Sequence, residues 1–200
     1  MPTPSVPDSR PLSTLDPAAY DRFGVVLFAP PDVVAAVDAL KEHLPRSGQP
    51  DLPAHVTVKN TFVAPTDLDA IAGRIAACCA AARPFRLTTG PLYDYKVADR
   101  LGTIGCTMVV APADAIVDLH RSLALALAPL TTPLWGAEDP DTIHPHMTIV
   151  QHIPAELVPG ARAIVERSPT DWRFAAEEVG LVGRRGGADW EVFRLFRLAA

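Results

Sequence analysis

The sequence contains one short pattern twice. His-Val-Thr-Val at residues 55–58 returns ninety-one residues later as His-Met-Thr-Ile at residues 146–149. On a β-strand, successive side chains point to opposite faces, so the histidine and threonine of each copy share one face while the aliphatic residues face a core. The sequence therefore predicts two strands that each present one imidazole and one hydroxyl on the same side.

The surroundings of the two motifs also repeat. Ala-Pro-Pro-Asp at residues 29–32 corresponds to Ala-Pro-Ala-Asp at residues 111–114, each between an apolar run and an amphipathic segment. We therefore predict a duplicated strand–helix–strand–helix unit, with repeats at about 23–97 and 101–198. The second copy has nine more residues between helix and motif, in a long loop at 129–143 that carries Trp135, and loops of this length are usually functional.

Apolar periodicity and turn residues give the expected elements. A flexible tail over residues 1–20 precedes one domain over 21–200, and Asp32 and Thr66 or Asp67 are expected at helix starts. The expected helices are 32–44, 66–83, 112–127 and 154–167. The expected strands are 23–29, 55–62, 85–89, 92–97, 103–111, 146–153, 172–183 and 190–198.

Charge and composition exclude several classes of partner. The net charge of −5 excludes the broad basic surface that non-specific binding to duplex DNA requires, but a local pocket can still bind a small anion or an RNA end. No secretory signal is visible, and the longest uncharged run, at 122–137, contains two prolines and is too short to cross a bilayer. Three cysteines form no disulfide framework, so we expect a cytoplasmic monomer without membrane partners.

The paired side chains suit acid–base chemistry on a phosphate. Histidine has a reference pKa near 6.5, so near neutral pH one imidazole can accept a proton while the other donates one. For a 2′,3′-cyclic phosphate, one of His55 and His146 would activate water and the other would protonate the leaving ribose oxygen. Thr57 and Thr148 would hold the non-bridging oxygens. The sequence does not distinguish acid from base.

The two motifs, together with Lys59 after the first and Pro145 before the second, resemble the paired HxTx motifs of the 2H phosphoesterase superfamily. The similarity is greatest to its 2′-5′ RNA ligase or RNA 2′,3′-cyclic phosphodiesterase branch and covers residues 23–198. The resemblance implies an α+β, bilobal duplicated fold, in which two antiparallel sheets line a central cleft and helices lie outside. It also implies His55, Thr57, His146 and Thr148 as catalytic residues, an RNA end or small nucleotide as substrate, and no metal or other cofactor.

Four other residues are candidates for substrate binding. Lys59 falls on the face of His55 and could add charge at the phosphate if the strand stays regular, although a solvated lysine explains it equally well. Trp135 and Tyr93 could stack on a base, but packing in the core or at its rim is the more common role of an aromatic residue. Arg184 could bind a terminal phosphate, whereas such residues more often lie at a solvated hairpin tip.

Three alternatives remain open from the sequence. His144 and His152 could join His146 on one strand face and bind zinc, although Pro145 disturbs the regularity and the carboxylates at 138–141 lie in a loop. The chain could instead be a non-catalytic protein that binds nucleotides or RNA ends. A third possibility is a related enzyme for a small cyclic phosphate that is not RNA.

Overall fold

A computed structural model describes residues 12–46, 52–63, 67–96, 103–111, 114–136, 140–187 and 189–199, with the backbone only at 93–96 and 103–111. The α-helices are α1 (Pro31–Lys41), α2 (Leu68–Ala81), α3 (Asp114–Leu127) and α4 (Val158–Glu166). The strands are β1 (Arg22–Phe28), β2 (His55–Val63), β3 (Phe85–Lys96), β4 (Thr103–Ala111), β5 (Thr132–Pro133), β6 (His146–Pro154), β7 (Arg173–Ala176), β8 (Glu178–Arg184) and β9 (Trp190–Arg197). Short 3-10 turns lie at Leu12–Thr14, Pro17–Ala19, Ala128–Leu130 and Ala155–Leu157.

The strands pair antiparallel in the order β7-β3-β4-β6-β2-β1-β8-β9, and β5 pairs with the end of β2. The two motif strands, β2 and β6, are neighbours at the centre of this order. The structure gives one residue pair between them, Val56 with Met147. We call β2, β1, β8 and β9 the first half-sheet and β6, β4, β3 and β7 the second, since this single pair joins them.

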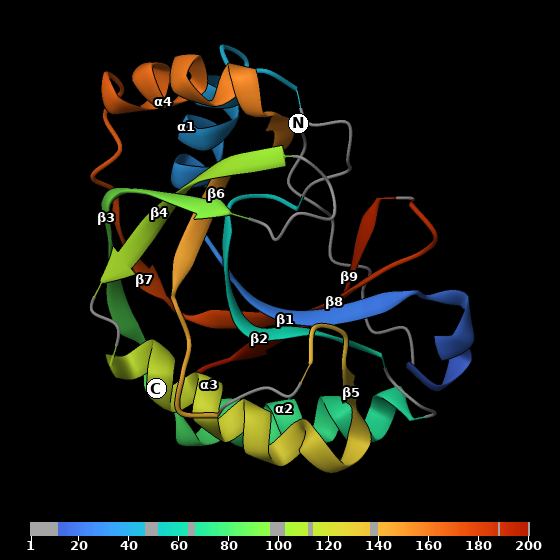
Figure 1. Ribbon diagram of the computed structural model, residues 1–200. Helices are drawn as coiled ribbons and strands as arrows, with labels where there is room; N and C mark the ends of the chain where they lie inside the picture. Colours follow the sequence, from blue (N-terminus) through green and yellow to red (C-terminus); the bar gives the residue numbers. More distant parts are fainter. Residues whose placement is uncertain are drawn as a thin grey trace.

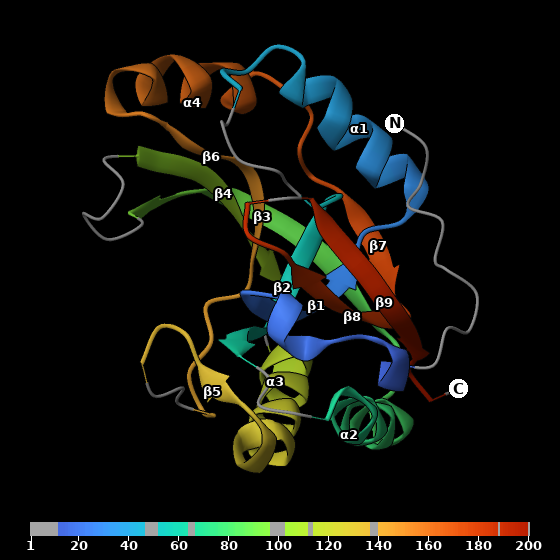
Figure 2. The same cartoon turned by 90° about the vertical axis from the view of Figure 1, so that its right-hand side faces the viewer.

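Helices cover the outside of both half-sheets. Helices α1 and α4 lie on one side of the strands and α2 and α3 on the other (Figures 1 and 2). Helix α3 packs on β2 and α2 on β9, whereas α1 packs on β6 and α4 on β4. The expected α+β architecture, with antiparallel sheets and outer helices, is confirmed.

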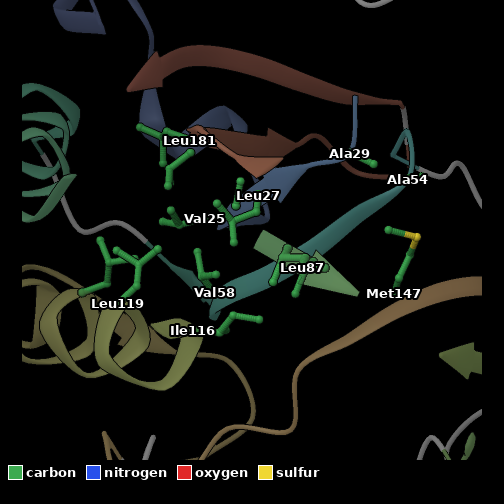
Figure 3. Close-up of a cluster of buried hydrophobic side chains, with 14 of the residues drawn as sticks. Val25, Leu27, Ala29, Ala54, Val58, Leu87, Ile116, Leu119, Met147 and Leu181 are labelled. Carbon is green, nitrogen blue, oxygen red and sulfur yellow. The ribbon is translucent and has the colours of Figure 1, made fainter. Parts of the chain in front are cut away.

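The two repeats exchange their last strands. Strand β3 closes the first repeat but pairs with β4 of the second, and β8 of the second repeat pairs with β1 of the first. Each half-sheet is therefore built from both halves of the chain. One hydrophobic core accordingly includes residues of both half-sheets, such as Val58 and Leu181 in the first and Leu87 and Met147 in the second (Figure 3).

Three expectations about the elements need correction. The strand expected at 172–183 is two strands, because β7 pairs with β3 in one half-sheet and β8 with β1 in the other. Strand β3 continues through Gly90-Pro91, where the structure records a register shift rather than a break. Asp32 was expected at the start of a helix, but the N-cap of α1 is Pro30 and Asp32 lies in the first turn. Asp67 caps α2 as expected, because its carboxylate accepts a hydrogen bond from the Ala70 N–H at 2.9 Å.

A flexible tail was expected over residues 1–20, and this expectation is wrong for residues 12–20. Leu12 is 2% exposed and Tyr20 is 4% exposed, and both belong to the hydrophobic core. The Tyr20 ring packs edge-on against Phe193, and its hydroxyl donates to the Glu191 carboxylate at 2.9 Å. Residues 12–20 are therefore part of the domain, while residues 1–11 lie outside the described part of the chain.

Candidate active site

The two motif strands bury the same positions. In β2, Val56 and Val58 are fully buried, whereas His55 and Thr57 are half-buried. In β6, Met147 and Ile149 are fully buried, and His146 and Thr148 are again half-buried. The aliphatic residues of each motif therefore face the core. The histidines and threonines face the opposite side, which we call the motif face.

The pairing of Val56 with Met147 sets the relative positions of the four polar residues. Val56 with Met147 is the one pair recorded between these strands, and because the strands are antiparallel, His55 and Thr148 follow it at one end while Thr57 and His146 follow it at the other. His55 and His146 lie diagonally across this pair, both at half-buried positions on the motif face.

Each motif histidine is oriented by the backbone two residues before it. The Nδ1 atom of His55 lies 2.8 Å from the Pro53 carbonyl oxygen, and Nδ1 of His146 lies 2.7 Å from the His144 carbonyl oxygen. A carbonyl oxygen can only accept a hydrogen bond, so Nδ1 of each ring carries the hydrogen. Nε2 is therefore the nitrogen that can gain or lose a proton in each ring.

The last residue of each motif is an extra residue in its strand. Thr57 pairs with Val26 but Lys59 pairs with Val25, so Val58 is the additional residue in β2. Thr148 pairs with Thr107 and Val150 with Cys106, so Ile149 has the same place in β6. Both irregularities are β-bulges, which bend a strand and shift the side chains beyond them.

The first bulge changes the position expected for Lys59. A regular strand was the premise for placing Lys59 beside His55, and the strand is not regular at this point. Lys59 is 1% exposed, and its Nζ lies 5.2 Å from the centre of the Phe62 ring in the core. The equivalent residue in the second half is the buried Val150. The bulge therefore removes the regular alternation on which the expected position of Lys59 depended.

Trp135 is held in place although its side chain is 68% exposed. Its indole N–H donates to the Thr61 hydroxyl at 2.7 Å, and the Leu134 N–H donates to the Thr61 carbonyl at 3.0 Å. Strand β5, two residues earlier, pairs with Phe62 and Val63 at the end of β2. The loop thus presents an aromatic ring in a defined place, about six strand residues from His55.

Tyr93 and Arg184 differ in their relation to the motifs. Tyr93 is in register with Thr107, which is in register with Thr148, but the side chain of Tyr93 lies outside the described residues. Arg184 is the last residue of β8, pairs with Arg22 and Trp190, and is 8% exposed, so it is not at a solvated hairpin tip.

The histidines considered for zinc do not share one strand face. His144 is exposed in the loop before β6, and His152 has a φ of 55°, a left-handed backbone conformation that breaks the alternation of β6. Within the described ranges, no group of three or more histidine, cysteine or acidic side chains is placed to bind a metal. Glu138 and Asp139 lie outside those ranges.

None of the helices in the described residues is long and apolar enough to cross a membrane.

A small apolar cluster on the motif face was missed from the sequence. Val26 pairs with Thr57 and packs with Leu52, Val182 and Val192, and Phe28, which pairs with His55, packs against this cluster. Leu52 is 6% exposed and precedes the carbonyl that orients His55. The run of apolar residues in β1 could have indicated that both of its faces are covered.

A family model described as the 2′-5′ RNA ligase superfamily matches residues 29–188 of the chain. The chain belongs to this superfamily. The predicted membership of the 2H phosphoesterase superfamily is thereby confirmed. No curated protein matches the sequence.

Two solved bacterial structures have the same fold as this chain. E. coli LigT in complex with 3′-AMP is 15% identical, with a TM-score of 0.60 over 91% of this chain and 99% of LigT. TT0787 of Thermus thermophilus is 18% identical, with a TM-score of 0.62 over 88% of this chain and 97% of that one. At such low identity the likeness shows the fold of this superfamily member, including its bilobal duplication.

Proposed function

We propose that this 2H phosphoesterase is a metal-independent phosphodiesterase that hydrolyses 2′,3′-cyclic phosphate or 2′-5′-linked ends of RNA or nucleotides. His55 and His146 are the acid–base pair. The observation that supports the proposal is the pairing of Val56 with Met147, because each of these residues directly adjoins one of the two histidines. The matching hydrogen bonds at Nδ1 give both rings the same orientation and leave Nε2 for proton transfer.

The proposed hydrolysis is balanced by two proton transfers. Nε2 of the neutral histidine takes a proton from water as the water oxygen bonds to phosphorus. The bond from phosphorus to one ribose oxygen breaks, and the protonated histidine gives its Nε2 proton to that oxygen. If a 5′-hydroxyl attacks in place of water, the same two transfers form a phosphodiester, which accounts for a ligase direction.

The two threonines hold the phosphate in this scheme. Thr57 and Thr148 occupy half-buried positions two residues after the histidines of their own strands, which supports this role. Each hydroxyl donates to one non-bridging oxygen and stabilises the negative charge as the new bond forms. Lys59 and Arg184 are both buried, so we assign them no contact with the phosphate in this scheme.

Nucleotides are the proposed ligand class. E. coli LigT, which shares the fold, has been crystallised with 3′-AMP, ATP and NADP+. In the present chain, Tyr93 is in register with the second motif and Trp135 presents an exposed ring. We assign Tyr93 to the reacting nucleotide. Trp135 lies about six strand residues from His55, which corresponds to about 20 Å along the strand. We therefore assign Trp135 to a base next to the reacting nucleotide in the RNA.

Incubation with 2′,3′-cyclic mononucleotides and chromatography of the products tests the main proposal. Release of a 2′-phosphate or a 3′-phosphate establishes turnover and identifies the bond that breaks. His55→Ala and His146→Ala should each lower kcat by about 10²–10⁴-fold. Both variants should keep affinity for a product nucleotide such as 3′-AMP. His43→Ala, which removes an exposed histidine after α1, is the matched control and should keep full activity.

Two outcomes separate the alternatives. Binding of 3′-AMP by a wild-type protein that turns over no cyclic nucleotide would establish the non-catalytic binding module. Turnover of a cyclic phosphate of an ADP-ribose-type molecule, with none of RNA-derived cyclic phosphates, would establish the related enzyme with a small non-RNA substrate.

The role of Trp135 has its own test. Trp135→Ala should raise KM for an oligoribonucleotide with a 2′,3′-cyclic end by about 5- to 150-fold, the range expected for one base–aromatic stack. The KM for a cyclic mononucleotide should stay unchanged. Leu125→Ala is the control, because it truncates a different exposed apolar side chain, one that lies on α3. It should change the KM for neither substrate. Equal effects of Trp135→Ala on both substrates would contradict this assignment.

A further inference from the structure

His120 is a buried histidine outside the motif pair. It lies on α3, where its neighbours on the buried face are Ile116, Leu119, Leu123 and Leu127, and its exposed fraction is 0%. A polar ring at such a position costs stability unless it forms a hydrogen bond. An aliphatic residue would otherwise be expected there, so the partner of His120 is informative.

That partner is the carbonyl group of Val58, the bulge residue at the end of the first motif. Nδ1 of His120 lies 3.1 Å from the carbonyl oxygen of Val58, and because a carbonyl only accepts, the ring donates. Val58 is the extra residue of the bulge and directly follows Thr57. Extra residues of bulges do not take part in the regular ladder, so their backbone groups need other partners. His120 supplies one from the helix behind the strand.

The two halves of the molecule differ at this point. Ile149 has the place of Val58 in β6, and the helix packed on β6 is α1. The buried residues of α1 are Val33, Val37 and Leu40, all of them aliphatic. A histidine behind the bulge is therefore found at the first motif, whereas the helix behind the second motif buries only aliphatic residues. The duplication of the fold does not account for this difference.

We infer that His120 is a positioning residue for the first half of the active site, an inference that rests on the proposed function. By holding the Val58 carbonyl, His120 keeps the bulge in one place and thereby keeps His55 and Thr57 on the motif face. A shift of one residue along a strand would turn these side chains toward the core. Smaller displacements also matter, because an error of about 1 Å in the position of a reacting group can cost about 100-fold in rate.

Three variants at position 120 separate positioning from packing. His120→Leu fills the space but cannot donate, so kcat should fall by about 10- to 100-fold while KM stays within about twofold. His120→Asn places an amide nitrogen near the position of Nδ1, so most of the activity should return. His120→Gln carries its amide one bond further out and should stay impaired. Comparison of the asparagine and glutamine variants remains decisive if His120→Leu does not fold.

Leu123→Val is the matched control, because it loosens the same buried helix face without removing a donor. It should lower Tm and leave kcat unchanged. The inference is overturned if His120→Leu has wild-type kcat, if the asparagine variant is no better than the glutamine variant, or if Leu123→Val loses as much activity for the same decrease in Tm.

A second measurement does not depend on turnover. The ¹⁵N NMR signals of the His55 ring report its tautomer and environment, and they should change in His120→Leu while those of His146 stay the same. Unchanged His55 signals in a folded His120→Leu protein would refute the positioning role. If the wild type hydrolyses no cyclic phosphate, the proposed function fails, and this NMR comparison still tests the link between His120 and His55.

Discussion

Replacing Thr57 with valine removes one hydroxyl from the motif face and keeps the shape and branching of the side chain. The hydrogen bond proposed for this hydroxyl is to a charged phosphate oxygen, which is worth about 1.5–3 kcal/mol. We therefore expect kcat/KM for a 2′,3′-cyclic nucleotide to fall by about 13- to 150-fold. Thr148→Val should cause a loss of the same size, because the two threonines have equivalent places in the two motifs.

The double variant gives the sharper test. Thr57 and Thr148 lie on neighbouring strands, so in the proposed mechanism the two hydroxyls bind different oxygens of one phosphate. Their losses should then add in free energy to about 3–6 kcal/mol, or about 150- to 25,000-fold in kcat/KM. A double variant no worse than the poorer single variant would mean that both hydroxyls act on one oxygen or through one another.

Controls distinguish this effect from a change in stability. Thr57→Ser keeps the hydroxyl and loses only a methyl group, so its kcat/KM should stay within about threefold of the wild type. Thermal unfolding of each valine variant should give a Tm close to that of the wild type, because valine and threonine both favour strands. If Thr57→Val keeps wild-type kcat/KM while His55→Ala is inactive, the threonine does not hold the phosphate, and that part of the mechanism is wrong.

Three further predictions concern packing, a buried thiol and metals. A Cβ at Gly183 would lie 2.5 Å from the Phe193 ring, so Gly183→Ala should lower Tm by about 2–12 °C. A Cβ at Gly160 in α4 would have no neighbour within 4 Å outside its own helix, so Gly160→Ala should raise Tm slightly. Thermal unfolding measures both changes. Burial raises the pKa of Cys79 to about 12, so iodoacetamide should not label it in the folded protein at pH 8, as mass spectrometry can check. Because this pKa is raised, the contribution of Cys79 to stability is complete below about pH 9 and is lost as the pH rises through 12. Dialysis against a chelator should leave phosphodiesterase activity unchanged, and loss of activity that added zinc restores would contradict the metal-independent mechanism.

The sequence by itself indicated which residues we propose for the chemistry and determined which face each of them takes within its strand. Alternation with a period of two is a local property, so histidine and threonine separated by one residue must share a face over any regular strand. The duplication was equally visible, because equivalent elements kept their order and their boundary residues. These signals require no knowledge of which distant segments meet.

Only the tertiary structure decided how the two motifs meet. Contacts between residues ninety-one positions apart depend on the exchange of β3 and β8 between repeats and on the single register pair of Val56 with Met147. Bulges arise from strand pairing, so the burial of Lys59 and the bond from His120 to Val58 could not be predicted from local pattern. The physical reason is that alternation sets a side chain's direction relative to its own strand, whereas the identity of its neighbours is set by packing between segments that are distant in sequence.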